Sequence, residues 1–154
     1  MKKKTWIFIS GLIWFAVGLS LLYKGLRFIS EGTMTAGSIC DRFKGTFGSA
    51  QQSGTVIVAI ALLIGFAKGR FVLSKTVQRV VGRIRSLPEP IAFGDVYARS
   101  YWIIIGSMAL LGLTMKYLPI PVDLRGFVDT AVGAALMNGA MLYFRANRTA
   151  PANS

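Results

Sequence analysis

The chain has 154 residues, of which 53% are hydrophobic and 16% charged, and 18 basic residues against 6 acidic ones give a formal charge of +12. A composition this apolar excludes an ordinary soluble domain and favours a membrane protein. Histidine is absent and Cys40 is the single cysteine. This excludes imidazole-ligated haem, cysteine-cluster zinc sites, iron–sulfur centres and histidine-based catalysis, so we expect neither a metal nor an organic cofactor.

The first two apolar stretches predict two membrane-spanning helices. Residues 6–23 contain no charge over 18 positions, which makes a helix of about 27 Å at ~1.5 Å per residue, close to the thickness of a bilayer core. The lysines at 2–4 also suit a secretory signal, but the length of the stretch favours a retained helix. The second stretch is residues 55–73, where Lys68 and Arg70 can extend their stems towards the headgroups.

Two further spans are predicted over residues 100–118 and 127–144. The third stops before Pro119, and proline close behind a helix is a stop signal. Short segments of the second and fourth spans are alike, Ala61-Leu-Leu-Ile-Gly65 and Ala135-Leu-Met-Asn-Gly139. Two interpretations stay open: a duplication into two parallel two-helix half-repeats, or convergent packing by small residues.

Four spans place both termini on the same side of the membrane. Twelve basic residues fall on that side and six on the other, so the positive-inside rule places both termini in the cytoplasm. The prediction is therefore an all-α integral membrane protein, with residues 1–154 forming a single four-helix membrane domain. We expect it in the cytoplasmic (inner) membrane of a bacterium.

The outer connection, residues 24–54, mixes Gly, Ser and Thr with scattered apolar residues. This predicts one or two short helices against the outer interface, with turns at Gly45, Gly48 and Ser49. Cys40 lies here without a partner in the chain. Either it is packed as a small apolar residue or it forms an intermolecular disulfide.

The cytoplasmic connection, residues 68–99, is basic and has a helical rhythm. Its apolar residues lie on one arc, and Lys75, Arg79 and Arg83 lie on the opposite arc. This predicts a basic amphipathic helix between the second and third spans, either continuing the second span or lying on the membrane. Its cations either bind anionic lipid headgroups or serve as a topology signal.

Stripes of small residues predict where the helices pack, because helices in lipid approach closely through such residues. In the first, second and fourth spans the stripes are Gly11, Gly18 and Gly25; Ala61, Gly65 and Gly69; and Ala131, Ala135 and Gly139, with Asn138 on the adjoining arc.

Few residues are candidates for chemistry. Asp129 is the one acid within a predicted span, near its outer end, where local capping or an ion site are the alternatives. Asn138 is expected to bond between helices, and nine positions of rotation place it opposite Asp129. With Ser107 and Thr114 these two residues form a candidate ion or solute site. Around the outer turn, Lys116, Asp123 and Arg125 are expected to form solvated surface pairs.

The sequence thus favours a non-catalytic accessory or scaffold subunit, which assembles with itself or within a larger membrane complex. Packing faces are abundant, whereas we find no catalytic residue pattern and no nucleic-acid-binding motif. The alternatives are a small transporter or channel built from the half-repeats, and a protein that binds anionic lipid.

Overall fold

The computed structural model describes residues 3–88, 106, 110 and 112–149. Within these residues the chain is helical apart from short connections, and three helices are long and apolar enough to cross a membrane: α1 (Lys3–Thr33), the continuous helix Ala50–Ser86, and α7 (Val122–Arg148). The prediction of an all-helical chain is confirmed over the described residues, and so is the presence of helices long and apolar enough to span a membrane. The third predicted span, 100–118, lies largely outside the described residues, so the number of crossings stays a prediction.

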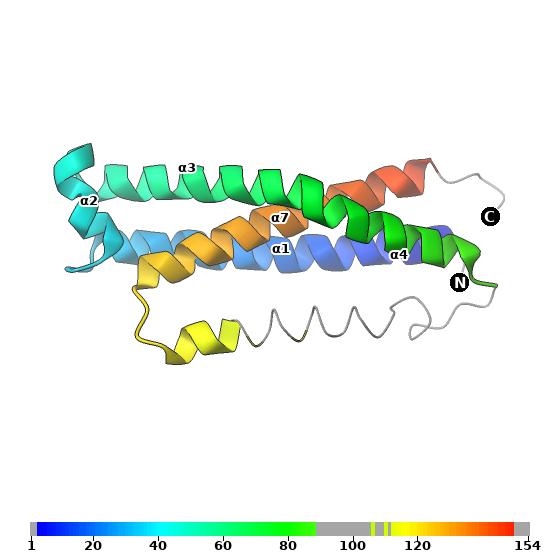
Figure 1. Ribbon diagram of the computed structural model, residues 1–154, viewed down its shortest axis with the longest axis horizontal. Helices are drawn as coiled ribbons and strands as arrows, with labels where there is room; N and C mark the ends of the chain where they lie inside the picture. The colour runs from blue at the N-terminus through cyan, green and yellow to red at the C-terminus, as the bar shows by residue number, and fades with distance from the viewer. Residues whose placement is uncertain (1–2, 89–105, 107–109, 111, 150–154) are drawn as a thin grey trace.

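The second predicted span and the basic segment as far as Ser86 form one continuous helix (Figure 1). It consists of α3 (Ala50–Lys68), the π-helical turn η1 (Gly69–Leu73) and α4 (Ser74–Ser86). Of the two arrangements left open by the sequence, the structure has the continuation of the second span. The bonds of a π turn run from residue i to i+5, so η1 holds one residue more than an α-helical turn.

Helices α1 and α7 pack against each other in opposite directions along glycines spaced seven residues apart. A Cβ added to Gly18 would lie 3.0 Å from the carbonyl oxygen of Gly133, and one on Gly11 would lie 2.9 Å from the Cβ of Tyr143. At the other end, a Cβ on Gly32 would lie 2.6 Å from the Cβ of Asp123. At Gly18 the two backbones touch, whereas at Gly11 and Gly32 the glycine leaves room for a side chain of α7, so a larger residue would clash at all three positions.

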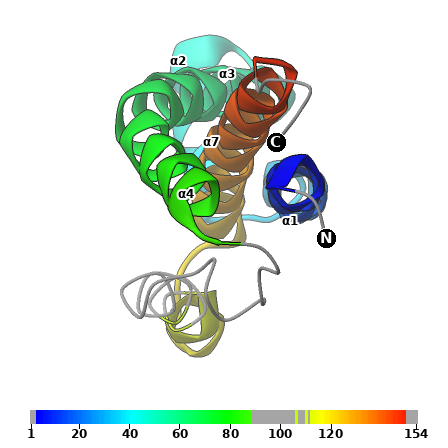
Figure 2. The same ribbon diagram turned by 90° about the vertical axis from the view of Figure 1, so that its right-hand side faces the viewer.

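Helices α3 and α7 run in the same direction, and α7 lies between α1 and the continuous helix (Figure 2). Gly65 faces the carbonyl oxygen of Ala131, and a Cβ on Gly69 would lie 2.8 Å from the Cα of Ala135. Ala61 is fully buried. The small residues that the sequence marks as contact faces thus lie against other helices of the same chain.

Apolar residues of α1, α4 and α7 form a core at one end of the bundle: Trp6, Ile7, Val77, Val80, Val81, Ile84 and Tyr143. There the Nζ of Lys3 donates a hydrogen bond to the carbonyl oxygen of Arg85 at 2.9 Å. Nη2 of Arg85 donates in turn to the carbonyl oxygen of Ala146 at 3.2 Å. We call this end, with the start of α1 and the ends of α4 and α7, the basic end.

The opposite end, which we call the α2 end, differs from the expected loop. Helix α1 continues to Thr33, ten residues past the predicted limit, and α2 (Ile39–Phe47) follows. Gly45 lies inside α2, so the turn expected there is wrong. Gly48, with φ of 91°, ends α2, and the Ser49 hydroxyl caps α3 by accepting a hydrogen bond from the Gln52 N–H at 3.1 Å.

Candidate functional site

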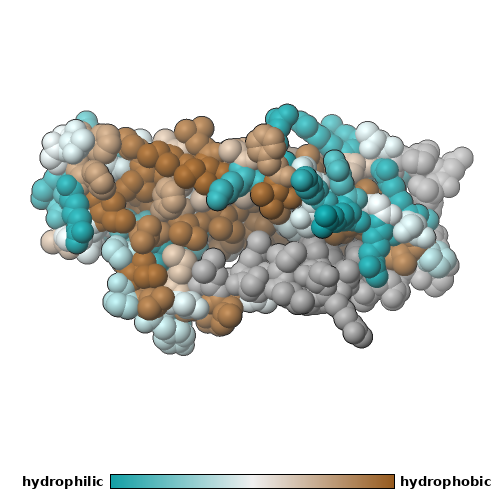
Figure 3. All heavy atoms as spheres, in the orientation of Figure 1, coloured by the Kyte–Doolittle hydropathy of each residue, from teal (hydrophilic) through white to brown (hydrophobic). Residues whose placement is uncertain are grey.

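Exposed cations follow the outward face of the second long helix. Figure 3 shows hydrophilic surface there, next to the apolar surface along α3. In η1 and α4 the cations lie on this face, and a buried leucine and buried valines lie on the opposite face. The amphipathic pattern expected from the sequence is therefore present there. The exposed cations are Lys68, Arg70, Lys75, Arg79 and Arg83.

The first two of these cations lie deep along the bundle. Gly69, between them, meets the backbone of Ala135, and two residues before Ala135 Gly133 meets Gly18 of α1. Because α1 and α7 are antiparallel, Ala135 is level with about Ala16 of α1, which is 10 residues from Trp6 and 7 from Tyr23, about 15 Å and ~10 Å at ~1.5 Å per residue. Lys68 and Arg70 therefore lie level with the middle of the uncharged stretch of α1, further from its ends than an extended side chain reaches. Sequence reasoning placed them near the headgroups.

The described acidic residues lie away from these cations. Glu31, Asp41, Asp123 and Asp129 belong to the end of α1, to α2 and to the first two turns of α7. The ion pairs within the described part of the chain are at the α2 end: Arg27 with Glu31 at 3.0 Å, and Lys44 with Asp41 at 2.7 Å. Lys68 and Arg70 consequently have no acidic partner among the described residues.

Asn138 lies on the face of α7 that packs against α3. Its Nδ2 donates a hydrogen bond to the carbonyl oxygen of Phe66 at 3.2 Å, three residues before η1 begins. A polar side chain on one helix thus binds the backbone of another near the point where the second helix leaves α-helical geometry.

Asp129 lies on another side of α7, with Lys24 of α1 and Arg125 as its charged neighbours. Both cations also flank the Phe28 ring, at 5.5 Å and 5.0 Å from its centroid. Nearby positive charge disfavours a metal ion at Asp129, and the ion pairs of the described residues do not include Asp129.

The polar residues proposed as a transport site are not assembled in the described part of the structure. Asp129 faces Lys24 of α1, whereas Asn138 faces α3. The Thr114 hydroxyl donates to the Leu110 carbonyl oxygen of its own helix at 2.8 Å. Ser107 lies outside the described residues.

Asp123 is the buried acid of the α2 end, and its expected place in a solvated surface pair is wrong. It is 1% exposed. Its Oδ2 accepts a hydrogen bond from the N–H of Cys40 at 2.8 Å, and its Oδ1 accepts one from the N–H of Leu124 at 3.0 Å. The carboxylate therefore stabilises the N-termini of two helices, where negative charge is favoured.

Cys40 is fully buried beside Asp123. Burial, followed by the charge of the Asp123 carboxylate, raises the pKa of the Cys40 thiol from 9.0 to about 11. The thiol is thus protonated and enclosed at neutral pH. This geometry corresponds to the packed thiol of the two alternatives that the sequence left open.

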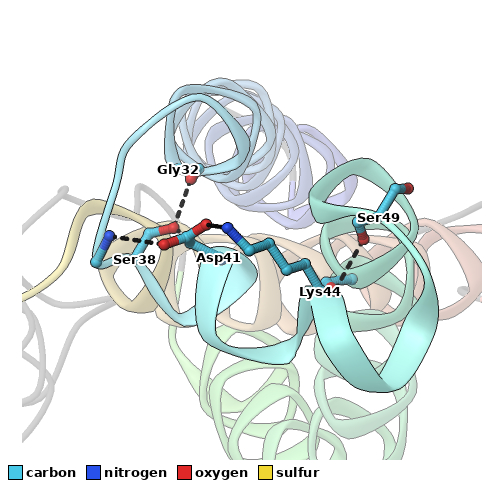
Figure 4. A network of polar contacts seen from close by, with 7 residues as sticks. Gly32, Ser38, Asp41, Lys44 and Ser49 are labelled. Atoms are coloured by element: carbon cyan, nitrogen blue, oxygen red, sulfur yellow. Dashed lines mark hydrogen bonds and ion pairs between the residues drawn. The ribbon is translucent and has the colours of Figure 1, made fainter.

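A second network holds the start of α2 (Figure 4). The Ser38 hydroxyl donates to the Gly32 carbonyl oxygen at 2.7 Å and accepts from the Asp41 N–H at 3.1 Å. The hydrogen bond from Lys44, helped by one from the Gly37 N–H, lowers the pKa of Asp41. These contacts are local capping. Over the described residues, no group of three or more metal-ligating side chains is found.

No protein-family model, curated protein or solved structure matches the chain. The roles assigned to the residues of the site are therefore argued from the geometry of this structure alone.

Sequence reasoning missed residues that the packing needs. Gly32 continues the spacing of Gly11, Gly18 and Gly25, and Gly126 and Gly133 are the seven-residue partners on α7. That repeat was visible in the sequence. The burial of Asp123 had no comparable signal, because it follows from the position of α2.

Proposed function

We propose that the protein is a non-catalytic accessory or scaffold subunit of a larger membrane complex, and that Lys68 and Arg70 contact an acidic residue of a partner helix within the membrane. The observation that carries this proposal is the position of these exposed cations, level with the middle of the uncharged stretch of α1. Charged residues at such depth are costly, and they pair with opposite charges or line water-filled cavities.

Self-association accounts for this position less well than a heteromeric complex. Copies of one membrane protein share one orientation, so a second copy would present the α2 end, with its described acids, far from Lys68. The small-residue stripes are also engaged within the chain. A partner that supplies its own acid at mid-depth matches the charge, and the exposed sides of α3 and η1 are where it would pack.

The test is purification of the native protein in mild detergent, with mass determination, for wild type and for Lys68→Gln/Arg70→Gln. We expect a defined heteromer for wild type and its loss in the double variant. The control is Lys75→Gln/Arg79→Gln, which removes equal charge nearer the basic end. A monomer that co-purifies with no protein, or equal loss in both variants, would overturn the proposal.

The number of crossings and the orientation belong to the same proposal. The chain crosses a bacterial cytoplasmic membrane four times, with both termini in the cytoplasm. This topology is supported by the start of α1 and the end of α7, which lie at the same end of the bundle, and by the cations there. Cations close to span ends are the ones that the positive-inside rule uses.

A further inference from the structure

Helix α4 has three faces, each with a separate set of neighbours. Leu73, Val77, Val80, Val81 and Ile84 point into the core. The cations at 75, 79 and 83 lie about 140° away by helical rotation of ~100° per residue. Between these two faces lies a third, with Ser74, Gln78, Gly82 and Arg85, which borders a groove towards α7.

The groove has a volume of about 310 Å³. Its apolar lining comes from Val77 and Val81 of α4 and from Leu142 and Ala146 of α7; Ser74, Gln78 and Thr149 add polar groups, and Arg85 lies at one end. Gly82 opens the groove further, since a Cβ built there would meet no atom within 4 Å. The volume is at the lower limit for small-molecule sites, which are also mostly apolar with a few polar groups.

The two ends of the groove lie at different depths. Arg85 is level with Lys3 and Ala146, just outside the first apolar residues of α1. Ser74, at the other end, follows Leu73, whose Cδ1 approaches Gly139 beside Trp14. From Ser74 to Arg85 the groove therefore extends about 16 Å at ~1.5 Å per residue, from the apolar depth of α1 to the interface.

Arg85 retains unused donors. A guanidinium has five N–H groups, and the hydrogen bond to the Ala146 carbonyl oxygen uses one of them. Exposed Arg145 and Arg148 lie on the neighbouring turns of α7. The acidic residues that the structure describes lie towards the α2 end. The charged residues described near Arg85 are therefore basic.

We propose that this groove binds one anionic phospholipid of the leaflet at the basic end, with its phosphate at Arg85 and an acyl chain along Val77, Val81 and Leu142. Both the direction from cation to apolar wall and the depth match a lipid in its own leaflet. A guanidinium is well suited to phosphate, because its planar donors bind two oxygens at once. This site is separate from the cations at 75, 79 and 83, and it does not depend on the proposed partner.

The test is native mass spectrometry of the delipidated full-length protein during titration with phosphatidylglycerol, phosphatidylcholine or inorganic phosphate. We expect one phosphatidylglycerol per chain at lowest concentration. Arg85→Gln should bind it about tenfold more weakly, since a charge-assisted hydrogen bond is lost. Gly82→Trp should also weaken binding, because the indole occupies the groove. The controls are Arg79→Gln, on the cationic face, and Gly45→Trp, an open glycine of α2.

Several results would overturn the proposal. Equal weakening by Arg79→Gln and Arg85→Gln would indicate general attraction to a basic helix, and equal binding of phosphatidylcholine would remove the preference for anionic lipid. Binding of inorganic phosphate with the affinity of the lipid would remove the acyl chain from the site. Retained helical circular dichroism in each variant separates lost binding from lost folding. If Arg85→Gln unfolds, Arg85→Lys replaces it, and intermediate binding is expected.

Discussion

At the scale of single residues, Asp123 links three helices. Its carboxylate bonds to the N-terminus of α2 through the Cys40 N–H and to its own helix through the Leu124 N–H. Its Cβ fills the space that Gly32 leaves on α1. A short helix such as α2 has little stability of its own, so this carboxylate does much to hold it against the bundle.

Replacing Asp123 by alanine should lower the free energy of unfolding by about 1–3 kcal/mol, because the buried Cys40 N–H loses its acceptor. Unfolding of the detergent-solubilised protein by sodium dodecyl sulfate, followed by tryptophan fluorescence, measures this change. Asp41→Ala is the control, since Asp41 is only half-buried and its contacts lie within α2 and the residues before it. A loss for Asp123→Ala no larger than for Asp41→Ala would contradict the role given to Asp123.

The Cys40 thiol should be unreactive in the folded protein. Its pKa of about 11 and its burial leave neither thiolate nor access for maleimide at pH 7 to 8, whereas the unfolded chain should react readily. Because the folded-state pKa lies above the ordinary 9.0, the thiol contributes stability below pH 9 that is lost as the pH rises towards 11. Mass-detected labelling with and without denaturant checks this, and a disulfide-linked dimer on a non-reducing gel would disprove the packed thiol.

At the scale of elements, the α1–α7 pair depends on backbone contact at glycine. A Cβ on Gly133 would lie 2.7 Å from the carbonyl oxygen of Gly18 and from the N of Leu22, and backbone atoms cannot move aside as a side chain does. The contact recurs every seven residues, close to two helical turns, so it stays on one seam of α1.

Gly133→Ala should therefore destabilise the bundle by about 1–3 kcal/mol through overpacking. Gly82→Ala is the matched control, because its Cβ meets no atom within 4 Å. This substitution should stabilise the helix by up to ~1 kcal/mol, since glycine has low helix propensity. The same sodium dodecyl sulfate titration compares the two variants, and a shift of the same sign in both would refute close backbone packing.

Sequence patterns predicted the apolar helices and the amphipathic rhythm of α4 because both follow from local spacing. They did not predict that α1 reaches Thr33 or that α7 starts at Val122. The polar residues that extend these helices gain their stability from tertiary contacts, such as Gly32 against Asp123. The depth of Lys68 and the groove beside Arg85 also required the relative positions of helices, which no single stretch of sequence contains.

At the scale of the whole molecule, the bundle has polar ends of different composition. The described acids lie towards the α2 end, whereas the described charges that meet at the basic end, Lys3, Arg85 and Arg148, are cations. This asymmetry favours one orientation across a membrane.

Cysteines introduced at Lys4 and at Arg148, in a Cys40→Ser background, should therefore be labelled from the cytoplasmic side of the membrane. A cysteine at Lys44 of α2 should be labelled from the other side. An impermeant maleimide applied to intact cells and to inverted vesicles measures this. Labelling of positions 4 and 148 from different sides would contradict both the proposed orientation and the arrangement of α1 and α7.

The wide turn η1 marks a place where the chain could lose one residue. Since Gly69–Leu73 holds one residue more than an α-helical turn, deleting one residue there would restore regular bonding without rotating the valines of α4 out of the core. We therefore expect a chain one residue shorter at this position to fold into the same bundle.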